Sequence, residues 1–336
     1  MRRIFRVVFL LVLALALALG YMFYKRIYGT AVDIDGEESV FYIHTGWTED
    51  DVLSALSEQE LIKGERAVGW VMEKKNYTGG LVVPGKYTVK SGMSAADLVN
   101  TLRAGRGEED VNVTFNSART LSELAGKVAS TIEADSSEIA NFLLSDDHIA
   151  KYGFKRATFK SMFLPDTYRF EWDTDAEQFV QRMADEYKKF WTADRMAKAN
   201  QLGLSQSEVT TLASIVQAEQ QSFPEERPAI AGLYLNRLKR GMRLQSDPTV
   251  IYALGDFTIN RVLTKQLRTE SAYNTYVVKG LPPGPINIPS KESIDAVLFA
   301  EDHNYLYMCA KSDFSGYHAF ASSLAEHNRN ARAFQR

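Results

Sequence analysis

An uncharged run of 18 residues near the amino terminus limits what this chain can fold into. Residues 7–24 read VVFLLVLALALALGYMFY, without a single Asp, Glu, Lys or Arg. At 1.5 Å per residue, a helix of this length and its flanking residues reach the ~30 Å thickness of a bilayer's hydrocarbon core. We therefore predict that residues 1–26 form a short cytoplasmic stub and a transmembrane anchor.

Positive charge is heavier before this run than after it, which predicts an orientation. Three arginines and the amino terminus precede the run, whereas one lysine and one arginine follow it directly. The positive-inside rule then places everything after residue 26 outside the cytoplasm. A cleaved signal peptide is the alternative, because the alternating alanines at 14–18 offer an A-x-A-like site. Such a cut would leave the aromatic residues within 21–24 exposed without a use, which favours the anchor.

Length, charge and cysteine content exclude several classes of protein. The 336 residues allow about two folded domains beside the anchor. A balance of 39 basic and 42 acidic residues gives no reason to expect nucleic acid as a partner. The only cysteine, Cys309, excludes an intramolecular disulfide and a zinc ribbon. No H-E-x-x-H, G-x-S-x-G or phosphate-loop motif occurs, and His318 is one of five histidines without a partner at metal-ligand spacing. We therefore predict no metal and no cofactor.

The part after the anchor divides into a connector and two folded segments. Residues 27–39 are polar and form the connector. Segment 40–110 begins with a strand and a helix, and its residues 85–102 combine a strand, a turn and a helix capped by Ser94. That order is similar to a LysM module, a small glycan-binding unit, and it also suits a plain structural subdomain. Segment 111–336 mixes strands and helices, so the predicted fold class is α+β.

Local signals predict the elements at the start of the larger segment. VNVTF at 111–115 alternates like a strand, and Thr120-x-x-Glu123 forms a capping box that opens a helix. Further along, Pro165 is expected to end regular structure, and Asp166 to hydrogen-bond its own turn.

A helix that opens at a Ser205-x-x-Glu208 capping box carries the clearest candidate for chemistry. Its apolar residues recur at i, i+3, i+4 and i+7, the spacing of a buried stripe, and Glu219 falls inside that apolar arc. An unpaired carboxylate on a buried face is costly, and desolvation would keep it protonated near neutral pH, as a general acid requires. From the helical wheel alone, a Glu219 that faces water at a fraying helix end fits equally well.

Polar side chains on two loops are candidates for contact with a ligand. Gln245 and Ser246 lie on a loop just before Asp247-Pro248, which we interpret as the N-cap and first-turn proline of a short helix. Residues 273–276 (YNTY) place two aromatic rings around amide and hydroxyl groups. This mixture suits a sugar, and it also occurs in ordinary buried turns.

Three further segments have predictable structure but no assigned chemistry. In a helix over roughly 225–240, Glu225 and Glu226 suit the first turn by dipole, and we assign them nothing more. Residues 280–289 hold four of the nine prolines, so this stiff loop favours either a binding rim or a rigid domain crossing. A carboxyl-terminal hairpin follows, with Cys309 expected in its core.

Six motifs occur in an order that is similar to one known family. They are FLPDTY at 163–168, ASIVQAEQ at 213–220, YLNRL at 234–238, LQSDPTVIY at 244–252, YNTY at 273–276 and GLPPGPI at 280–286. From about residue 40 to the end, the chain resembles the endolytic murein transglycosylases, also called MltG or YceG-like proteins. The resemblance implies a lyase with one membrane span in the bacterial inner membrane, cleaving peptidoglycan on the extracytoplasmic (periplasmic) side.

The resemblance also implies which residues act. The family helix usually reads S-I-V-E-x-E with the second glutamate catalytic, and here Gln217 replaces the first while Glu219 keeps the second. Before FLPDTY the family commonly has E-G-x-L/F, whereas this chain begins that stretch with Lys160. A structural role for the missing glutamate is favoured over a catalytic one.

The implied reaction cleaves the β-1,4 bond between N-acetylmuramic acid (MurNAc) and N-acetylglucosamine (GlcNAc) and closes a 1,6-anhydro ring. Glu219 would act first as acid and then as base. An ordinary glycosidase needs a second carboxylate, for which Asp247 is the nearest candidate, although a cap and loop organiser is the favoured interpretation. The predicted substrate-binding residues are Gln245, Ser246, Asp247, Asn274 and Tyr276.

Two alternative functions remain at this stage. One is a hydrolase of the same bond, whose products would carry one extra water. The other is a non-catalytic, membrane-anchored glycan binder or scaffold for cell-wall synthases, which has no reason to keep a polar residue on an apolar helix. The predicted partners are peptidoglycan glycan strands and the membrane, and the resemblance adds penicillin-binding protein synthases, near which the enzyme would fix strand length.

Overall fold

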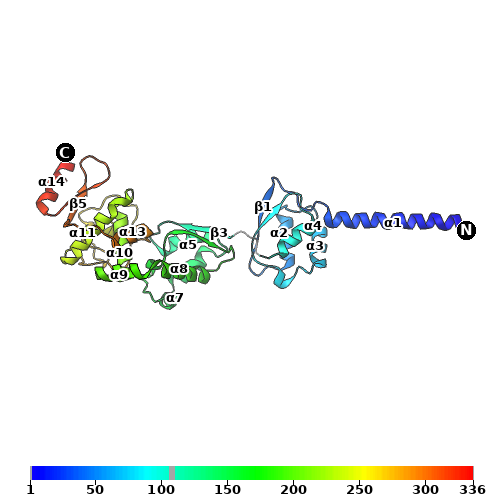
Figure 1. Ribbon diagram of the computed structural model, residues 1–336, viewed down its shortest axis with the longest axis horizontal. Helices are drawn as coiled ribbons and strands as arrows, with labels where there is room; N and C mark the ends of the chain where they lie inside the picture. The colour runs from blue at the N-terminus through cyan, green and yellow to red at the C-terminus, as the bar shows by residue number, and fades with distance from the viewer. Residues whose placement is uncertain (1, 106–109, 336) are drawn as a thin grey trace. The chain divides into compact units, whose positions relative to one another are not determined.

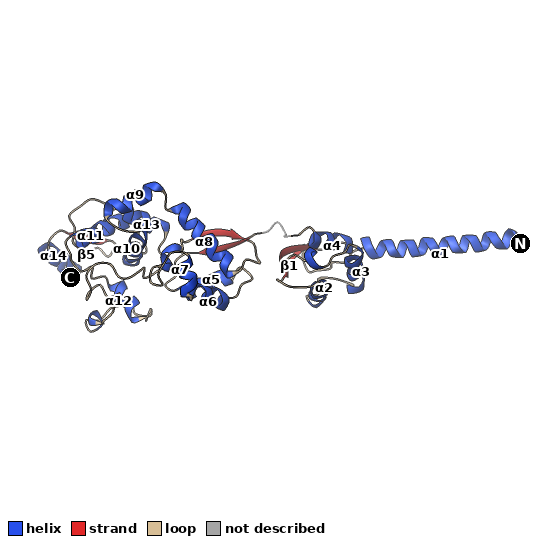
Figure 2. Cartoon of the chain, turned by 90° about the horizontal axis from the view of Figure 1, so that it is seen from below, coloured by secondary structure: helices blue, strands red, loops and turns tan. Residues whose placement is uncertain are grey.

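The structure is a computed structural model that describes residues 2–105 and 110–335 as helices, short strands and loops (Figure 1). The chain forms two compact units. The first contains the described residues up to Val113 and the segments Thr131–Glu133 and Arg169–Thr174, and the second contains Thr114–Ser130, Ala134–Tyr168 and the described chain from Asp175 onward. Helices predominate, and each named strand belongs to a two-stranded sheet (Figure 2). The predicted mixture of helices and strands is confirmed.

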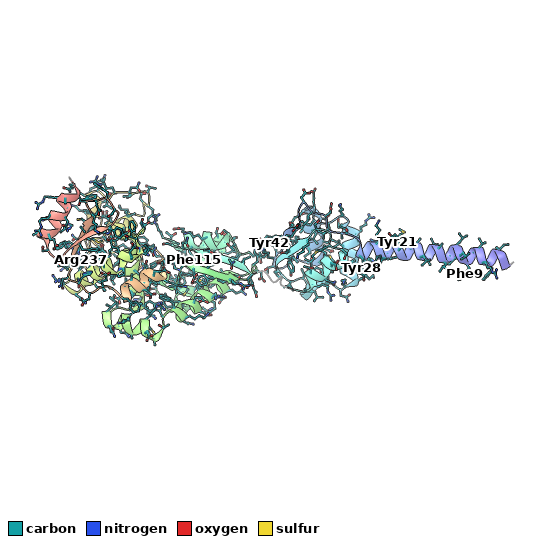
Figure 3. The ribbon with its side chains drawn as sticks, turned by 45° about the horizontal axis from the view of Figure 1, so that its top comes forward. Phe9, Tyr21, Tyr28, Tyr42, Phe115 and Arg237 are labelled. Carbon is teal, nitrogen blue, oxygen red and sulfur yellow. The ribbon has the colours of Figure 1, made fainter. Side chains whose placement is uncertain are left out.

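Helix α1 (Arg2–Tyr28) contains the apolar run found in the sequence. Its stretch Ile4–Tyr28 has a mean hydropathy of 2.5, and none of the most apolar window is buried inside the protein. Figure 3 shows Phe9, Tyr21 and Tyr28 projecting from this helix. A core helix of a water-soluble domain would bury much of such a surface, so α1 is compatible with a membrane anchor in length and composition.

The first unit is built on an antiparallel pair of strands, β1 (Glu38–Ile43) and β2 (Gly85–Lys90). Their inward residues include Phe41 and Tyr87, which face each other in the register and are fully buried. The helices of this unit pack against one another and share the core with the sheet; they are α2 (Glu49–Glu58), α3 (Glu65–Lys74) and α4 (Ala95–Arg103), with a 3-10 turn η1 (Gly79–Leu81). Complete capping boxes begin α2 at Thr48 and α4 at Ser94.

Strand β3 (Val111–Phe115) has the bounds predicted from sequence and pairs with β4 (Asp166–Phe170). As expected, no helix continues through Pro165, but the strand that begins at the next residue was not predicted. Asp166 does accept the backbone N–H of Thr167, at 2.8 Å, as a turn residue would. It also binds Lys291 by a hydrogen bond, a pairing that no local sequence signal indicates.

Helices dominate the second unit. The first group comprises α5 (Leu121–Ala129), α6 (Ser136–Leu144), α7 (Asp146–Lys151), η2 (Phe159–Met162), α8 (Ala176–Phe190) and α9 (Ala193–Leu202). The second comprises α10 (Gln206–Glu219), η3 (Pro224–Glu226), α11 (Arg227–Lys239), α12 (Asp247–Leu254), η4 (Gln266–Arg268), α13 (Lys291–Leu298), and α14 (Leu324–Phe334) behind the hairpin β5 (Tyr307–Ala310) and β6 (His318–Ala321).

Helix α10 is the centre of the second unit. Ser205 and Glu208 form the predicted capping box at its start, and residues 209–216 are all buried. It packs against α11, α12 and α13, so both its position and its rotation are fixed on several sides. Burial of its apolar side chains, at roughly 25 cal/mol per Å² of apolar surface, makes this helix a rigid base for the residues at its carboxyl end.

The proline-rich loop at 280–289 packs tightly against the rest of the second unit. Ser214 of α10 accepts the N–H of Ile286 on its hydroxyl and the Asn287 amide on its carbonyl. At Gly284 the backbone passes so close to Ala157 that a Cβ would lie 1.8 Å from the Ala157 carbonyl oxygen. Only glycine therefore fits at this crossing.

Candidate functional site

Glu219 is the last residue of α10, and two hydroxyl groups bind its carboxylate. Tyr234 Oη donates to Oε1 at 2.7 Å, and Ser246 Oγ donates to the same oxygen at 2.5 Å. No hydrogen bond from the described residues to Oε2 is found. Because both donors occupy Oε1, the proton of a neutral Glu219 belongs on Oε2.

The environment of Glu219 favours the protonated acid. The residue keeps some exposed surface, but its carboxyl group is closely surrounded by protein, and the resulting desolvation raises its pKa above the ordinary value. The hydrogen bonds from Ser246 and Tyr234 act in the opposite direction, and so does nearby His318. Of the two arrangements left open by the helical wheel, the structure has the carboxyl group inside the fold.

Ser246 reaches Glu219 from a loop whose backbone is fixed by threonines. Its N–H donates to Thr275 Oγ1 at 3.0 Å, and its carbonyl accepts the hydroxyl of Thr249 at 2.7 Å. Ser246, Thr249 and Thr275 are all fully buried. The preceding Gln245 takes a positive φ of 52°, and its exposed side chain lies at the rim of the pocket. Such backbone strain in a non-glycine residue is often found where a loop must present a functional group.

Asp247 and Tyr276 meet at the edge of the same site. Tyr276 Oη donates to Asp247 Oδ1 at 2.6 Å. Burial, followed by this hydrogen bond, raises the pKa of Tyr276, so its hydroxyl stays protonated and remains a donor. The interpretation of Asp247 as an N-cap was wrong by one residue: Ser246 takes the cap position and uses its hydroxyl on Glu219 instead.

The side-chain hydrogen bonds of Asn274 stay within its own loop and do not reach Glu219. Its amide nitrogen donates to the carbonyls of Leu267 and Thr269, and its amide oxygen accepts the N–H of Tyr276. The residue is fully buried. Both ends of the amide are thus used within the loop, and this geometry gives no support to the prediction that Asn274 contacts a sugar.

The buried Glu226 and the half-buried His318 form a pair that no motif in the sequence indicates. Both oxygens of Glu226 are engaged, one by the His318 N–H at 2.8 Å and the other by His318 Nδ1 at 2.7 Å and Gln220 Nε2 at 2.7 Å. Only 8% of Glu226 is exposed, so its pairing with His318 goes beyond the favourable helix-dipole position to which the prediction was limited. The pair lies 92 residues apart in sequence, and no local pattern could have joined its members.

An open pocket of about 260 Å³ lies beside the carboxyl end of α10. Its lining includes Glu219, Tyr234, Arg237, Gln245, Asp247, Tyr276, Cys309 and His318. Cys309 is half-buried in this wall, so the expectation of a core cysteine was wrong. In the part of the chain that the structure describes, no cluster of His, Cys, Asp and Glu could hold a metal ion.

The two departures from the family pattern both have structural partners. Gln217 Oε1 accepts the Ser290 N–H at 2.7 Å and the Ser293 hydroxyl at 2.9 Å, at the start of α13. These contacts need only an acceptor oxygen, which glutamine and glutamate both supply. Lys160 is 5% exposed and donates to the Arg119 carbonyl at 3.0 Å and to the Tyr252 hydroxyl at 2.9 Å.

Replacing Lys160 with Met should change how stability depends on pH. Desolvation lowers the pKa of Lys160 to about 7, below its unfolded value, so the unfolded chain binds more protons above pH 7 and the wild type gains stability there. Relative to Lys160→Met, the wild type should gain about 2 kcal/mol between pH 7 and pH 9. Urea unfolding at several pH values measures this gain, and the exposed Lys265→Met variant, which should show none, is the control. A stability difference that does not change with pH would contradict a lowered pKa for Lys160.

Known proteins that are similar to this chain identify its family. The YceG-like family model matches residues 41–333. The chain is 29% identical to an endolytic murein transglycosylase of Bacillus subtilis, over 92% of this chain and 89% of the relative. It is 26% identical to one of Streptococcus pneumoniae, over 97% of this chain and 64% of the relative. The crystal structure of a YceG-like protein from Listeria monocytogenes aligns with a TM-score of 0.59 and 25% identity, over 87% of this chain and 98% of that one. The family recognised from the motifs is thereby confirmed: the chain belongs to the YceG-like family.

Proposed function

We propose that this chain is a peptidoglycan lytic transglycosylase in which Glu219 serves first as general acid and then as general base. The enzyme class rests on relatives named endolytic murein transglycosylases, which imply a lyase with peptidoglycan as substrate. The observation that carries the mechanism is a desolvated carboxyl group with both hydrogen-bond donors on Oε1 and its other oxygen unbound by the described residues, on the wall of a pocket.

In the first step, Glu219 transfers the proton on Oε2 to the glycosidic oxygen between MurNAc and GlcNAc. The bond from that oxygen to C1 of MurNAc breaks, and GlcNAc leaves with a new hydroxyl group. The carboxylate that remains is stabilised by Tyr234 and Ser246, which already donate to Oε1. Desolvation favours the acid before the transfer, and these two bonds favour the anion after it.

In the second step, the 6-hydroxyl of the same MurNAc attacks C1, and Glu219 accepts its proton. A 1,6-anhydro ring closes, and the acid form of Glu219 is restored without addition of water. One side chain can perform both transfers because each step reverses its protonation state. Gln245, Asp247 and Tyr276 are proposed to bind the sugar at the pocket rim, while Ser246 acts through Glu219.

Mass spectrometry of the products distinguishes this reaction from hydrolysis of the same bond. Purified peptidoglycan strands treated with the full-length chain should release fragments that end in anhydro-MurNAc. Fragments heavier by one water, with reducing ends, would identify a hydrolase, for which a second carboxylate such as Asp247 would be needed. Release of no fragments at all would overturn the proposed activity.

We also propose a role for each segment of the chain. Residues 1–26 act as anchor and 27–39 as connector, and 111–336 form the catalytic domain outside the cytoplasm, as heavier positive charge before the span favours. Segment 40–110 is proposed as a LysM-like subdomain, and glycan-polymerising synthases as partners. Treatment of intact and lysed spheroplasts with protease would test the orientation. If the residues after the span lie outside the cytoplasm, they are cleaved in intact spheroplasts as well as in lysed ones.

A further inference from the structure

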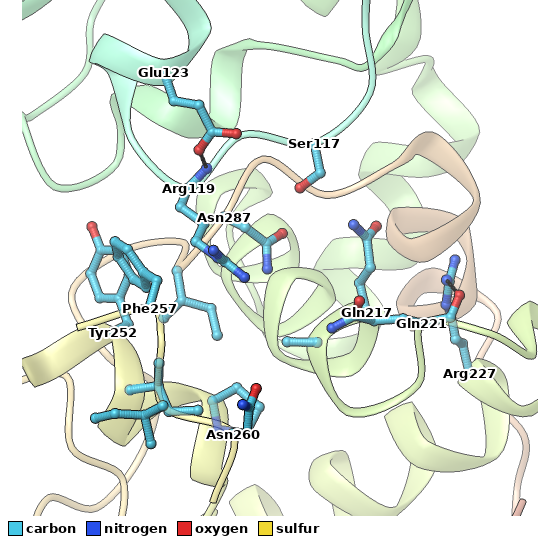
Figure 4. Close-up of a pocket in the computed structure, with 15 residues that line it drawn as sticks. Ser117, Arg119, Glu123, Gln217, Gln221, Arg227, Tyr252, Phe257, Asn260 and Asn287 are labelled. Atoms are coloured by element: carbon cyan, nitrogen blue, oxygen red, sulfur yellow. Dashed lines mark hydrogen bonds between the residues drawn. The ribbon is translucent and has the colours of Figure 1, made fainter. Parts of the chain in front are cut away.

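A second cavity, larger than the Glu219 pocket, lies at the end of α10 with Gln217 and Ala218 in its lining. It measures about 700 Å³ and is lined by polar residues from several elements together with an apolar wall. Figure 4 shows Tyr252 and Phe257 on one side of this cavity and Gln217, Gln221 and Arg227 on the other, with Asn287 between them. None of these residues is used in the mechanism above.

The charge in this cavity favours an anion. Arg119 places its guanidinium 4.9 Å from the ring centre of Phe257. Arg227 is 7% exposed and donates to neutral acceptors only: the carbonyls of Gln220 and Gln221 and the hydroxyl of Ser293. The carboxylate in the lining, Glu123, already pairs with Lys127 and accepts the backbone N–H of Arg119. Neither guanidinium group forms an ion pair within the described residues, although Glu123 acts on Arg119, and Glu225 and Glu292 act on Arg227, at longer range. Both groups can therefore pair directly with the carboxylates of a ligand.

The uncharged lining suits a peptide. Asn287 is 9% exposed, and its amide oxygen has no hydrogen-bond partner among the described residues. An acceptor buried without a partner is costly, and a ligand N–H would remove that cost. The apolar wall of Pro248, Ile251, Ile259 and Ile286 can cover small side chains such as alanine methyl groups. The amide groups of this lining can also bind sugar hydroxyls, so the two arginines are the feature that favours a ligand with carboxylates.

The cavity and the Glu219 pocket share one wall. Gln217 and Ala218 line the cavity, and Glu219 is the next residue on the same helix. Pro248 lines the cavity, while its neighbour Asp247 lines the pocket. In peptidoglycan, the peptide is attached through a lactyl group to O3 of MurNAc, the ring whose C1 is attacked. A peptide on that ring must therefore leave the pocket within a short distance of Glu219.

We propose that this cavity binds the carboxylate-bearing stem peptide of the MurNAc residue at which the strand is cut, with Arg119 and Arg227 binding its carboxylates and Asn287 a peptide N–H. The proposal rests on the proposed function, because it takes peptidoglycan as the substrate. Lys160 supports the site because its amine donates hydrogen bonds to the Arg119 carbonyl and the Tyr252 hydroxyl.

Kinetics on two substrates test the proposal with the full-length chain in detergent. One substrate is glycan strands with their stem peptides, and the other is the same strands stripped of peptides by an amidase. The ratio of kcat/KM for peptide-bearing over stripped strands should exceed one in the wild type and fall roughly tenfold in Arg119→Glu, the loss expected for one charge-assisted contact. Arg119→Lys should give an intermediate ratio, and the exposed Arg240→Glu, outside the cavity, should retain the wild-type ratio.

The other outcomes are distinguishable. An Arg119→Glu variant that slows cleavage of both substrates equally would overturn the proposal and assign the cavity to sugar. A wild type without preference would also overturn it. If the wild type cleaves neither substrate, the proposed function fails, and calorimetric titration of the full chain with free stem peptide then decides the cavity separately. Binding lost in Arg119→Glu but retained in Arg240→Glu would support the cavity, and no binding to the wild type would overturn it.

Discussion

Replacement of Glu219 by Gln is expected to lower the release of anhydro-MurNAc fragments about a thousandfold, within the range that one general acid–base group contributes. Glutamine preserves the shape of the side chain, and its amide oxygen can still accept from Tyr234 and Ser246, as Oε1 does in the wild type. What is lost is the transferable proton. Initial rates on purified strands, with fragments quantified by mass spectrometry, measure the effect.

The fold of this variant should be intact or slightly more stable. The pKa of Glu219 is raised on folding, so the wild type loses stability as pH rises above the unfolded pKa, and Glu219→Gln does not. The melting temperature of the variant relative to the wild type should therefore increase from pH 4 to pH 8. The exposed Glu301→Gln variant is the matched control and should retain full activity. A Glu219→Gln enzyme that still turns over at the wild-type rate would rule out the proposed mechanism.

Replacement of Gly284 by Ala is expected to destabilise the second unit by at least about 3 kcal/mol, at the upper end for overpacking substitutions. The new Cβ would lie 1.8 Å from the carbonyl oxygen of Ala157 and 2.6 Å from its carbonyl carbon. Both are backbone atoms, so relief requires movement of a whole segment rather than a side-chain rotation. Urea unfolding monitored by tryptophan fluorescence measures the loss.

Gly126→Ala is the matched control for this prediction. Gly126 lies within α5, and a Cβ there meets no atom within 4 Å. Alanine in an exposed helix interior is favoured over glycine by up to about 1 kcal/mol, so this variant should be slightly stabilised. Equal stabilities of the two variants would show that the loop at 280–289 is free to move away from Ala157, contrary to the packing described above.

Local signals in the sequence were sufficient for much of the fold. Strand β3 has the predicted bounds, and α4 and α10 begin at the predicted caps, Ser94 and Ser205. Each of these features depends on residues within a few positions of one another. Strand β4 was missed because its partner β3 lies some fifty residues earlier, and an isolated strand after a proline resembles a turn.

The site was predictable only in part, for the same reason. The helical wheel placed Glu219 inside an apolar arc, yet its donors come from α11 and from the loop before α12. The role of Tyr234 was not predicted, since nothing in the sequence distinguishes a buried ring from one whose hydroxyl binds a carboxylate. Glu226 and His318 meet only because the hairpin returns to the start of α11.

The place of Glu219 at the very end of α10 has an electrostatic consequence of its own. The backbone dipoles of an α-helix leave partial negative charge at its carboxyl terminus, which disfavours an anion there. A glutamate in that position holds its hydrogen more firmly than the same residue at a helix start would. Helix polarity thus acts in the same direction as desolvation and the charge of nearby Asp247, both of which raise the pKa of Glu219 and keep it protonated.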